Sequence, residues 1–289
     1  MRPGRDSRGV TETVLITGCS SGIGRETARA FLDDGWEVYA TARNPADVQT
    51  LGEAGANIAT LDVTEQDDVE RVVDRIVDEH GRIDCLVNNA GYAQLGPVED
   101  VPVERVEDQF AVNVFGPHRL VRAVLPHMRE RRAGTVVNVS SVSGRIATPG
   151  MGVYNGSKFA MEGLTDALRP EVDEYGIDVV LVEPGPVDTA FTKRAASEIE
   201  GVERSDAYEG LYSILDDTEA IGGGGPGSIP PRRVAEAVLD AANLTDPAPR
   251  YPVGRVAKVG GLARLVPARL RDRLYGLATS LVSKNPLGD

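Results

Sequence analysis

The chain has 289 residues, 41% of them hydrophobic and 26% charged, which is the composition of a folded globular protein and argues against bulk disorder or a collagen-like structure. Its formal net charge of -13 disfavours nucleic acid as a partner, and no run of about 18 apolar residues predicts a transmembrane helix. Two cysteines do not make a disulfide framework and no apolar stretch follows the basic first ten residues, so we expect a cytoplasmic protein.

Short apolar strands and helices alternate over most of the chain. Partly β-branched apolar runs predict strands at 13–16, 37–41, 57–61, 83–87, 135–139 and 177–182. Apolar residues at helical spacing predict helices over 22–34, 69–81, 103–114, 118–131, 153–175 and 231–243. The alternation predicts an α/β fold, a single-domain Rossmann-type doubly wound parallel sheet of about seven strands flanked by helices.

Three regions are expected to differ in role. Residues 1–11 form a disordered or loosely held extension, residues 12–250 the Rossmann-type domain, and residues 251–289 a basic amphipathic extension. Within the domain the alternation breaks down over 186–230, and such a long excursion predicts a lid. Its apolar residues either line a substrate pocket or only pack the lid onto the body, and they are Phe191, Tyr208, Leu211, Tyr212, Ile214 and Leu215.

The C-terminal extension is basic whereas the body is acidic. From Arg250 to Asp289 there are eight basic residues and two acidic ones. Apolar residues at helical spacing, interrupted by Pro267, predict two short amphipathic helices. We expect them to pack on the acidic body or on a partner subunit of a homo-oligomer, a dimer or a tetramer, and a membrane-surface contact is the alternative.

A glycine-rich turn follows the first strand. Residues Thr17 to Gly24 read G-x3-G-x-G and stand between a predicted strand and a predicted helix. Glycines let the backbone approach a pyrophosphate, and the helix N-terminus supplies free N–H groups and a positive dipole. The segment therefore predicts a dinucleotide phosphate site, with a plain strand-to-helix turn as the alternative.

Tyr154 and Lys158 lie four residues apart on a predicted helix, so their side chains share one face. A free phenol has a pKa of about 10, and a nearby ammonium lowers it. Ser141 follows a strand whose carboxyl end is a ligand-binding position, where its hydroxyl can hold a substrate oxygen, and Ser143 is the competing candidate. We expect Lys158 to lower the pKa of Tyr154, which then exchanges a proton with the substrate.

Asn113 lies in an apolar stretch of a predicted helix, where asparagine has poor propensity. A buried asparagine must find hydrogen-bond partners. Two interpretations remain open: the side chain holds the structure together, or it belongs to a proton path.

The end of the second strand indicates the type of nicotinamide cofactor. NAD sites place an acid there, but residues 40–44 contain none, and the first acid is Asp47. Arg43 would pair with a 2′-phosphate, and Ser21 could add a hydroxyl. The residues favour NADP(H) over NAD(H), unless Arg43 is only a solvated residue at a helix start.

Taken in order, these motifs resemble the classical short-chain dehydrogenase/reductase family. The matching segments span about residues 12–245 and are Thr17–Gly24, Asp62–Val63, Asn88–Gly91, Asn113, Ser141, Tyr154, Lys158 and Pro184–Gly185. The runs Val14–Ser21 and Val38–Thr41 look like the 17-beta-hydroxysteroid dehydrogenase and retinol dehydrogenase branch.

The resemblance implies an NADP(H)-dependent carbonyl reductase or alcohol dehydrogenase for an apolar ketone, aldehyde or secondary alcohol. It implies Tyr154 as general acid/base, Lys158 as the residue that lowers its pKa and binds the ribose, Ser141 as the group that polarises the carbonyl, and Asn113 as the anchor of a water relay. The cofactor contacts that it implies are Gly18, Ser20, Ser21, Gly22, Ile23, Gly24, Arg43, Asp62, Val63, Asn89, Ala90, Gly91, Tyr154, Lys158, Pro184, Gly185, Val187 and Thr189.

Two other functions compete with this one. An NAD-dependent alcohol dehydrogenase of the same family would use the same residues in the opposite direction. A non-catalytic nucleotide-binding redox sensor would keep the fold, but it has no need of the four catalytic residues. No metal-ligand cluster is visible in the sequence.

Overall fold

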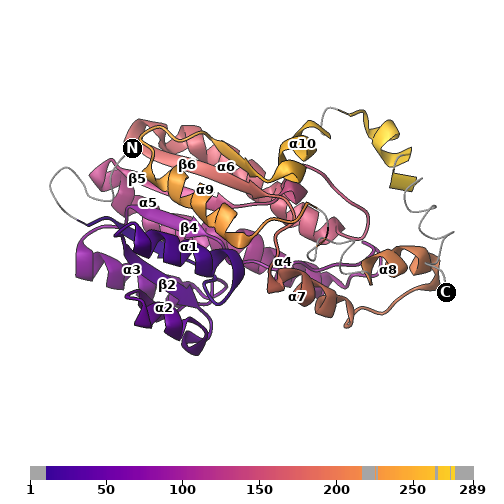
Figure 1. Cartoon of the computed structure of the whole chain (residues 1–289), viewed down its shortest axis with the longest axis horizontal. Coiled ribbons are helices and arrows are strands. Elements are labelled where there is room, and N and C mark those ends of the chain that lie inside the picture. Colours follow the sequence, from indigo (N-terminus) through magenta and orange to yellow (C-terminus); the bar gives the residue numbers. More distant parts are fainter. Residues whose placement is uncertain (1–10, 217–224, 226, 264–265, 274, 277–289) are drawn as a thin grey trace.

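The structure is a computed structural model that describes residues 11–216, 225, 227–263, 266–273 and 275–276 (Figure 1). Residues 1–10, most of the glycine run at 222–227 and residues 277–289 lie outside the described part of the chain, and so do the expectations that concern them. No helix within the described residues is both long and apolar enough to cross a bilayer.

In the described part of the chain, seven parallel strands form one sheet in the order β3-β2-β1-β4-β5-β6-β7. The strands are β1 (Thr13–Ile16), β2 (Glu37–Ala42), β3 (Asn57–Thr60), β4 (Cys85–Asn88), β5 (Gly134–Val139), β6 (Ile177–Pro184) and β7 (Arg250–Val253). The order reverses direction between β1 and β4, so the carboxyl ends of these two strands flank a ligand-binding crevice. The predicted doubly wound Rossmann-type fold is confirmed.

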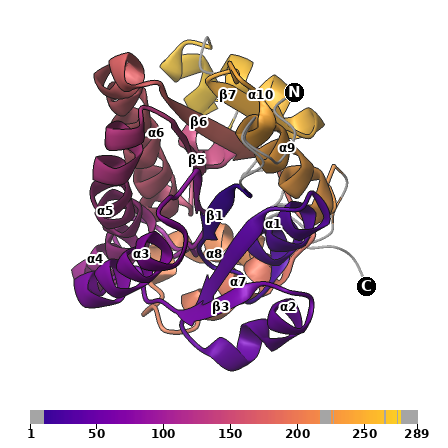
Figure 2. The same ribbon diagram turned by 90° about the vertical axis from the view of Figure 1, so that its left-hand side faces the viewer.

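Helices cover both faces of the sheet (Figure 2). One face packs against α1 (Gly22–Asp33), α2 (Gln49–Glu53) and α9 (Pro231–Asn243). The other packs against α3 (Gln66–His80), α5 (Gly116–Arg131) and α6 (Gly152–Val172). Because both faces are covered, the central strands are apolar in consecutive positions, which is why they read as continuous hydrophobic runs.

The two helices expected over 103–131 are one continuous element. α4 (Val103–Phe110) passes through a π turn (Ala111–Phe115) directly into α5. Pro117 has no N–H, so it cannot donate to the carbonyl of Asn113 four residues before it. The wider turn absorbs this break in the hydrogen-bond ladder without ending the helix.

The seventh strand, β7, pairs with β6 at the edge of the sheet. The expected end of the domain at residue 250 therefore falls at the first residue of a strand. Its sequence Arg-Tyr-Pro-Val escaped prediction because Pro252 within so short a run argues against a strand, although an edge strand tolerates proline.

The chain after β7 forms α10 (Arg255–Ala263), which packs on the body. Ala257 is buried, and a Cβ on Gly260 would lie 2.5 Å from Cγ2 of Val142. The start of the basic extension therefore packs on the body of its own chain. This is one of the two packing surfaces expected for it, the other being a partner subunit.

The expected lid segment contains α7 (Ala190–Ile199) and α8 (Glu209–Leu215), which lie at one end of the sheet beside α4 (Figure 1). Tyr212 and Leu215 are 3% and 2% exposed, so they hold the lid on the body. Phe191 is 37% exposed and remains available to a ligand.

Candidate active site at the carboxyl ends of the strands

The turn between β1 and α1 has the geometry of an anion cradle. Gly18 and Gly22 have positive φ values of 72° and 54°, which favour glycine. A Cβ on Gly24 would lie 2.3 Å from the carbonyl oxygen of Gly18, so only glycine lets α1 approach the turn. Among the described residues, no side chain caps the helix at Ser21 and no acid occupies its first turn. The first N–H groups of α1 are therefore open to an anion such as pyrophosphate.

The loop after β4 holds this turn in place. Asn89 Nδ2 donates to the carbonyl oxygens of Thr17 at 2.8 Å and Gly18 at 3.2 Å. The backbone N–H groups of Asn89 and Ala90 donate to Thr17 Oγ1 at 3.1 and 3.0 Å. A Cβ on Gly18 would lie 2.8 Å from Cα of Ala90. The side chain of Asn89 is therefore committed to shaping the turn.

Two further predicted cofactor positions follow β3. Asp62 Oδ1 accepts hydrogen bonds from the backbone N–H and the hydroxyl of Thr64, at 2.9 and 2.8 Å. Val63 is buried against Gly116, whose Cβ, if present, would lie 2.7 Å from Val63 Cγ2. Both residues follow β3 at the carboxyl edge of the sheet.

The remaining predicted positions follow β6. Gly185 donates its backbone N–H to the carbonyl oxygen of Val253 at 3.0 Å, and Val187 forms a bridge with Ile229. Thr189 caps α7 and faces the glycine turn, because a Cβ on Gly22 would lie 3.1 Å from Thr189 Cγ2. The segment expected to form the lid therefore begins beside the glycine turn.

Two arginines lie near the end of β2, Arg43 directly after the strand and Arg25 in α1. Arg43 is exposed directly after β2. The guanidinium of Arg25 donates to the carbonyl oxygens of Ser20 and of Asp47, the latter at 2.9 Å, and so links the glycine turn to the loop after β2. Arg25 was not among the predicted residues, and the signal that could have found it is its position directly after Gly24.

Tyr154, Lys158 and Ser141 come together as predicted from their spacing. Tyr154 and Lys158 are 6% and 5% exposed on one face of α6, with Lys158 Nζ 6.0 Å from the centroid of the Tyr154 ring. Lys158 Nζ donates to the carbonyl oxygen of Val139 at 2.9 Å. Ser141 Oγ accepts from the backbone N–H of Ser143 at 3.1 Å, so Ser143 orients Ser141, which is the serine bonded to Tyr154.

The protonation of the pair differs from the expectation. Burial raises the pKa of Tyr154 to about 12, opposed by the hydrogen bond with Ser141. Burial also lowers the pKa of Lys158 to about 8, opposed by the charge of Glu162. Desolvation of the phenol therefore dominates the net pKa of Tyr154 in this structure, and a lowering contribution from Lys158 stays a prediction. At neutral pH the phenol is protonated, which is the form that donates a proton.

Asn113 is fully buried in the π turn between α4 and α5. Its Nδ2 donates to the carbonyl oxygen of Tyr92 at 3.0 Å and to Ser157 Oγ at 3.1 Å, and its Oδ1 accepts from the backbone N–H of Tyr92 at 3.2 Å. These bonds tie the loop after β4 to α6, one residue from Lys158. They support the structural interpretation of Asn113, and the water relay stays a prediction.

Apolar side chains surround the Tyr154 ring. A buried cluster joins it to Ala93, Leu95 and the lid residues Ala195, Ile199, Tyr212 and Leu215. The ring of Phe191 lies 5.8 Å from the ring of Tyr154, measured between centroids. Residues 11–216 and the other described ranges contain no cluster of three His, Cys, Asp or Glu side chains that could hold a metal ion.

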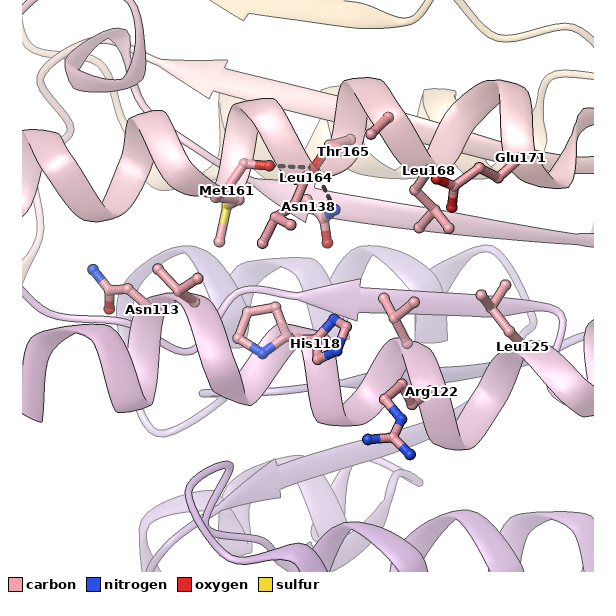
Figure 3. Close-up of a pocket in the computed structure, with 14 residues that line it drawn as sticks. Asn113, His118, Arg122, Leu125, Asn138, Met161, Leu164, Thr165, Leu168 and Glu171 are labelled. Atoms are coloured by element: carbon pink, nitrogen blue, oxygen red, sulfur yellow. Dashed lines mark hydrogen bonds between the residues drawn. The ribbon is translucent and has the colours of Figure 1, made fainter. Parts of the chain in front are cut away.

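A cavity of about 230 Å³ lies elsewhere, between α5 and α6 (Figure 3). Side chains of the two helices face one another across it, with Asn138 of β5 at its base. Asn138 Nδ2 donates to Thr165 Oγ1 at 2.9 Å. Ser141, Tyr154 and Lys158 do not line this cavity, so it is separate from the candidate active site.

Comparison with known proteins identifies the family. The sequence model described as short chain dehydrogenase matches residues 12–200. The chain is 36% identical over 251 residues to 3-ketodihydrosphingosine reductase of Bacteroides thetaiotaomicron, covering 86% of this chain and 90% of that one. It is 32% identical over 274 residues to NADPH-dependent 3-dehydrocapnine reductase of Ornithobacterium rhinotracheale, covering 90% and 95%. A short-chain dehydrogenase from Streptomyces avermitilis superposes with a TM-score of 0.77 at 34% identity, covering 95% of this chain and 98% of that one. The chain therefore belongs to the short chain dehydrogenase family of oxidoreductases.

Proposed function

We propose that the protein is an NADP(H)-dependent carbonyl reductase that converts an apolar ketone to a secondary alcohol. The observation that carries the proposal is the placement of Tyr154: its side chain is 6% exposed, its ring centroid lies 6.0 Å from Lys158 Nζ, and it packs against apolar residues of the segment expected to form a lid. A protonated donor suits reduction, because charge builds on the substrate oxygen and must be neutralised.

The glycine cradle fits the pyrophosphate of a dinucleotide. Gly18 and Gly24 let the backbone approach more closely than a Cβ would allow, Gly22 has a positive φ, and no side chain caps the first N–H groups of α1 at Ser21. Arg43 and Arg25 supply positive charge near the end of β2, where a 2′-phosphate would lie. One reductase that this chain resembles is NADPH-dependent by its name, which supports the choice of NADP(H).

The chain's own residues account for positioning and proton transfer. When bound, the reduced nicotinamide supplies the hydride. Tyr154 donates the proton from its hydroxyl to the substrate oxygen, and Ser141 donates a second hydrogen bond to the same oxygen. Lys158 holds its positive charge beside Tyr154 and favours the phenolate left after transfer. Phe191 and the apolar cluster around Tyr154 exclude water from the reacting atoms.

The test uses purified protein, NADPH and a panel of apolar ketones, with NADPH oxidation followed spectroscopically. Tyr154→Phe keeps the ring and its packing but removes the proton donor. We expect turnover to fall by about 10²–10⁴ while the affinity for NADPH stays unchanged. Ser141→Ala should lower turnover less, because the proton donor remains. Near-native turnover in Tyr154→Phe would remove Tyr154 from its role.

The same assay separates the competing functions. Oxidation of secondary alcohols with NAD that exceeds ketone reduction with NADPH would favour the alcohol dehydrogenase. Tight NADPH binding without turnover of any carbonyl or alcohol would favour the redox sensor.

We further propose that a second copy of the chain covers the face formed by α5 and α6. Leu164, which lines the cavity, is 50% exposed, and Phe115, the last residue of the π turn before α5, is 52% exposed. Arg122 and Glu171 both line that cavity (Figure 3), so two copies related by a two-fold axis could pair the arginine of one with the glutamate of the other.

A further inference from the structure

Glu162 continues the row of functional side chains along α6. It follows Lys158 by four residues, as Lys158 follows Tyr154, so the three lie along one helix face. Glu162 is 5% exposed, and a carboxylate at such depth is destabilising unless charged partners compensate it. The partners of Glu162 therefore determine what it can do to Lys158.

Two arginines compensate Glu162 from one side. The Nη1 atom of Arg250, at the start of β7, donates to Glu162 Oε2 and to Glu183 Oε1, and its Nη2 lies 2.5 Å from Asp166 Oδ2. Arg145 Nη1 lies 4.0 Å from Glu162 Oε2 and 3.8 Å from Glu183 Oε1. Both arginines approach Glu162 through the same oxygen, Oε2.

The other oxygen of Glu162 lies close to Gly144 and to the hydroxyl of Ser140. A Cβ on Gly144 would lie 3.1 Å from Glu162 Oε1 and 2.8 Å from Ser140 Oγ. Both atoms are buried, and neither has a hydrogen-bond partner of ordinary geometry among the described residues. Burial raises the pKa of Glu162, and the nearby Ser140 hydroxyl opposes this effect. The charge on Oε1 is therefore not engaged by either arginine.

Together with Lys158 the cluster joins four cations and three carboxylates. The cations are Lys158, Arg145, Arg250 and Arg169, which lies 3.1 Å from Asp166, and the carboxylates are Glu162, Asp166 and Glu183; they come from α6, β6, β7 and the segment after η3 (Val142–Gly144). Tyr154 is the remaining titratable group beside Lys158. Removal of one carboxylate would increase the excess of positive charge around a buried ammonium.

We propose that Glu162 is a positioning residue whose carboxylate keeps Lys158 charged and so lets Lys158 support proton transfer by Tyr154. The role of Glu162 rests on the function proposed above for Tyr154 and Lys158. Without Glu162, the nearest fixed charges include Arg145 and Arg250, both of which disfavour the ammonium. The effect on Lys158 can be measured without any substrate.

The direct test is the titration of Lys158 by NMR. The chain has only four lysines, at 158, 193, 258 and 284, so ¹³C-labelled lysine gives few signals, and Lys158→Ala assigns one of them. In Glu162→Gln we expect the pKa of Lys158 to fall by about one unit or more. Glu162→Asp keeps the charge and should restore most of the shift. Glu183→Gln removes the same charge from the same cluster but from β6, outside the helix face of Lys158, and should change the titration much less.

The pH profile of ketone reduction gives a second readout. Lys158 must be protonated to act, so activity falls as the pH rises through its pKa. In Glu162→Gln this alkaline limb should move to lower pH, whereas in Glu183→Gln it should stay in place. A cluster with only a structural role would destabilise both variants and leave the limb unchanged.

The outcomes are distinguishable. An unchanged Lys158 titration in folded Glu162→Gln would overturn the role of Glu162 while leaving the proposed reductase intact. If that variant does not fold, Ser140→Ala removes only the hydroxyl that stabilises the Glu162 charge, and it should shift Lys158 in the same direction by less. No shift in Ser140→Ala would then count against the proposal. Wild-type protein that reduces no carbonyl would refute the reductase, yet the titration would remain measurable.

Discussion

At the scale of single residues, burial governs the chemistry of the site. Tyr154 and Lys158 share a helix face, and their spacing predicted that Lys158 lowers the pKa of Tyr154. Instead desolvation moves each toward its neutral form, raising the pKa of Tyr154 and lowering that of Lys158. Groups that restore the charge of Lys158 therefore matter as much as the pair itself, and Glu162 is the nearest of them along α6.

The selectivity for the cofactor also depends on single residues. Arg43→Ala removes a positive charge at the end of β2 and should weaken NADPH binding roughly tenfold or more, because a charge-assisted contact with the 2′-phosphate is lost. NADH lacks that phosphate, so its affinity should change little. Binding of both cofactors is measured by fluorescence titration.

A matched variant controls this experiment. Arg29→Ala also removes one arginine, but from an exposed position on α1, where Arg29 pairs with Glu26. It should leave both affinities unchanged. Equal losses for NADPH and NADH in Arg43→Ala would contradict the assignment of Arg43.

At the scale of elements, one carboxylate contacts two residues of the segment expected to form the lid. Asp100, in the segment before α4, accepts hydrogen bonds from the hydroxyl of Tyr212 at 2.8 Å and from the hydroxyl and N–H of Ser205 at 2.9 and 3.2 Å. Burial acts to raise the pKa of Asp100, but these hydrogen bonds outweigh it and the pKa is lowered. The stabilisation is therefore present above the ordinary pKa of Asp, about 4, and is lost as the pH falls through the lowered value.

Loosening this contact should change substrate binding more than chemistry. Tyr212→Phe keeps the buried ring and removes the hydrogen bond to Asp100. We expect hydrogen exchange in α8 to accelerate roughly three- to tenfold and KM for the ketone to rise, with kcat little changed. Tyr208→Phe, which removes the bond to the neighbouring Glu99 from an exposed position, serves as the comparison. Equal exchange in Tyr212→Phe and wild type would show that Asp100 does not hold the lid.

At the scale of the whole molecule, the sheet places all the functional segments at one edge. The turn after β1, the loops after β4 and β6, and the helix after β5 meet there because parallel strands present their carboxyl ends together. The face of α5 and α6 lies apart from this edge, so assembly through it would leave the site accessible.

Assembly through that face is testable. Leu164→Glu places a charge on the exposed apolar surface and should convert a dimer or tetramer into smaller species in sedimentation experiments, since desolvating an unpaired charge opposes association. Val259→Glu changes an equally apolar residue, 68% exposed on α10, and should leave the mass unchanged. A wild-type monomer, or an unchanged mass in Leu164→Glu, would disprove the proposed interface.

The sequence by itself determined the strand–helix alternation, the glycine turn and the Tyr154–Lys158–Ser141 set, because local periodicity and backbone demands at glycine are written residue by residue. It did not reveal β7, since a proline-containing run of four residues becomes a strand only by pairing with the edge of β6. Nor did it show the bridge from Arg25 to the loop after β2, or the cluster around Glu162, which joins residues up to 105 positions apart, Arg145 and Arg250 among them. Protonation of the site was decided by tertiary structure alone, because burial, a property of the packed molecule, outweighs the charges that sequence spacing brings together.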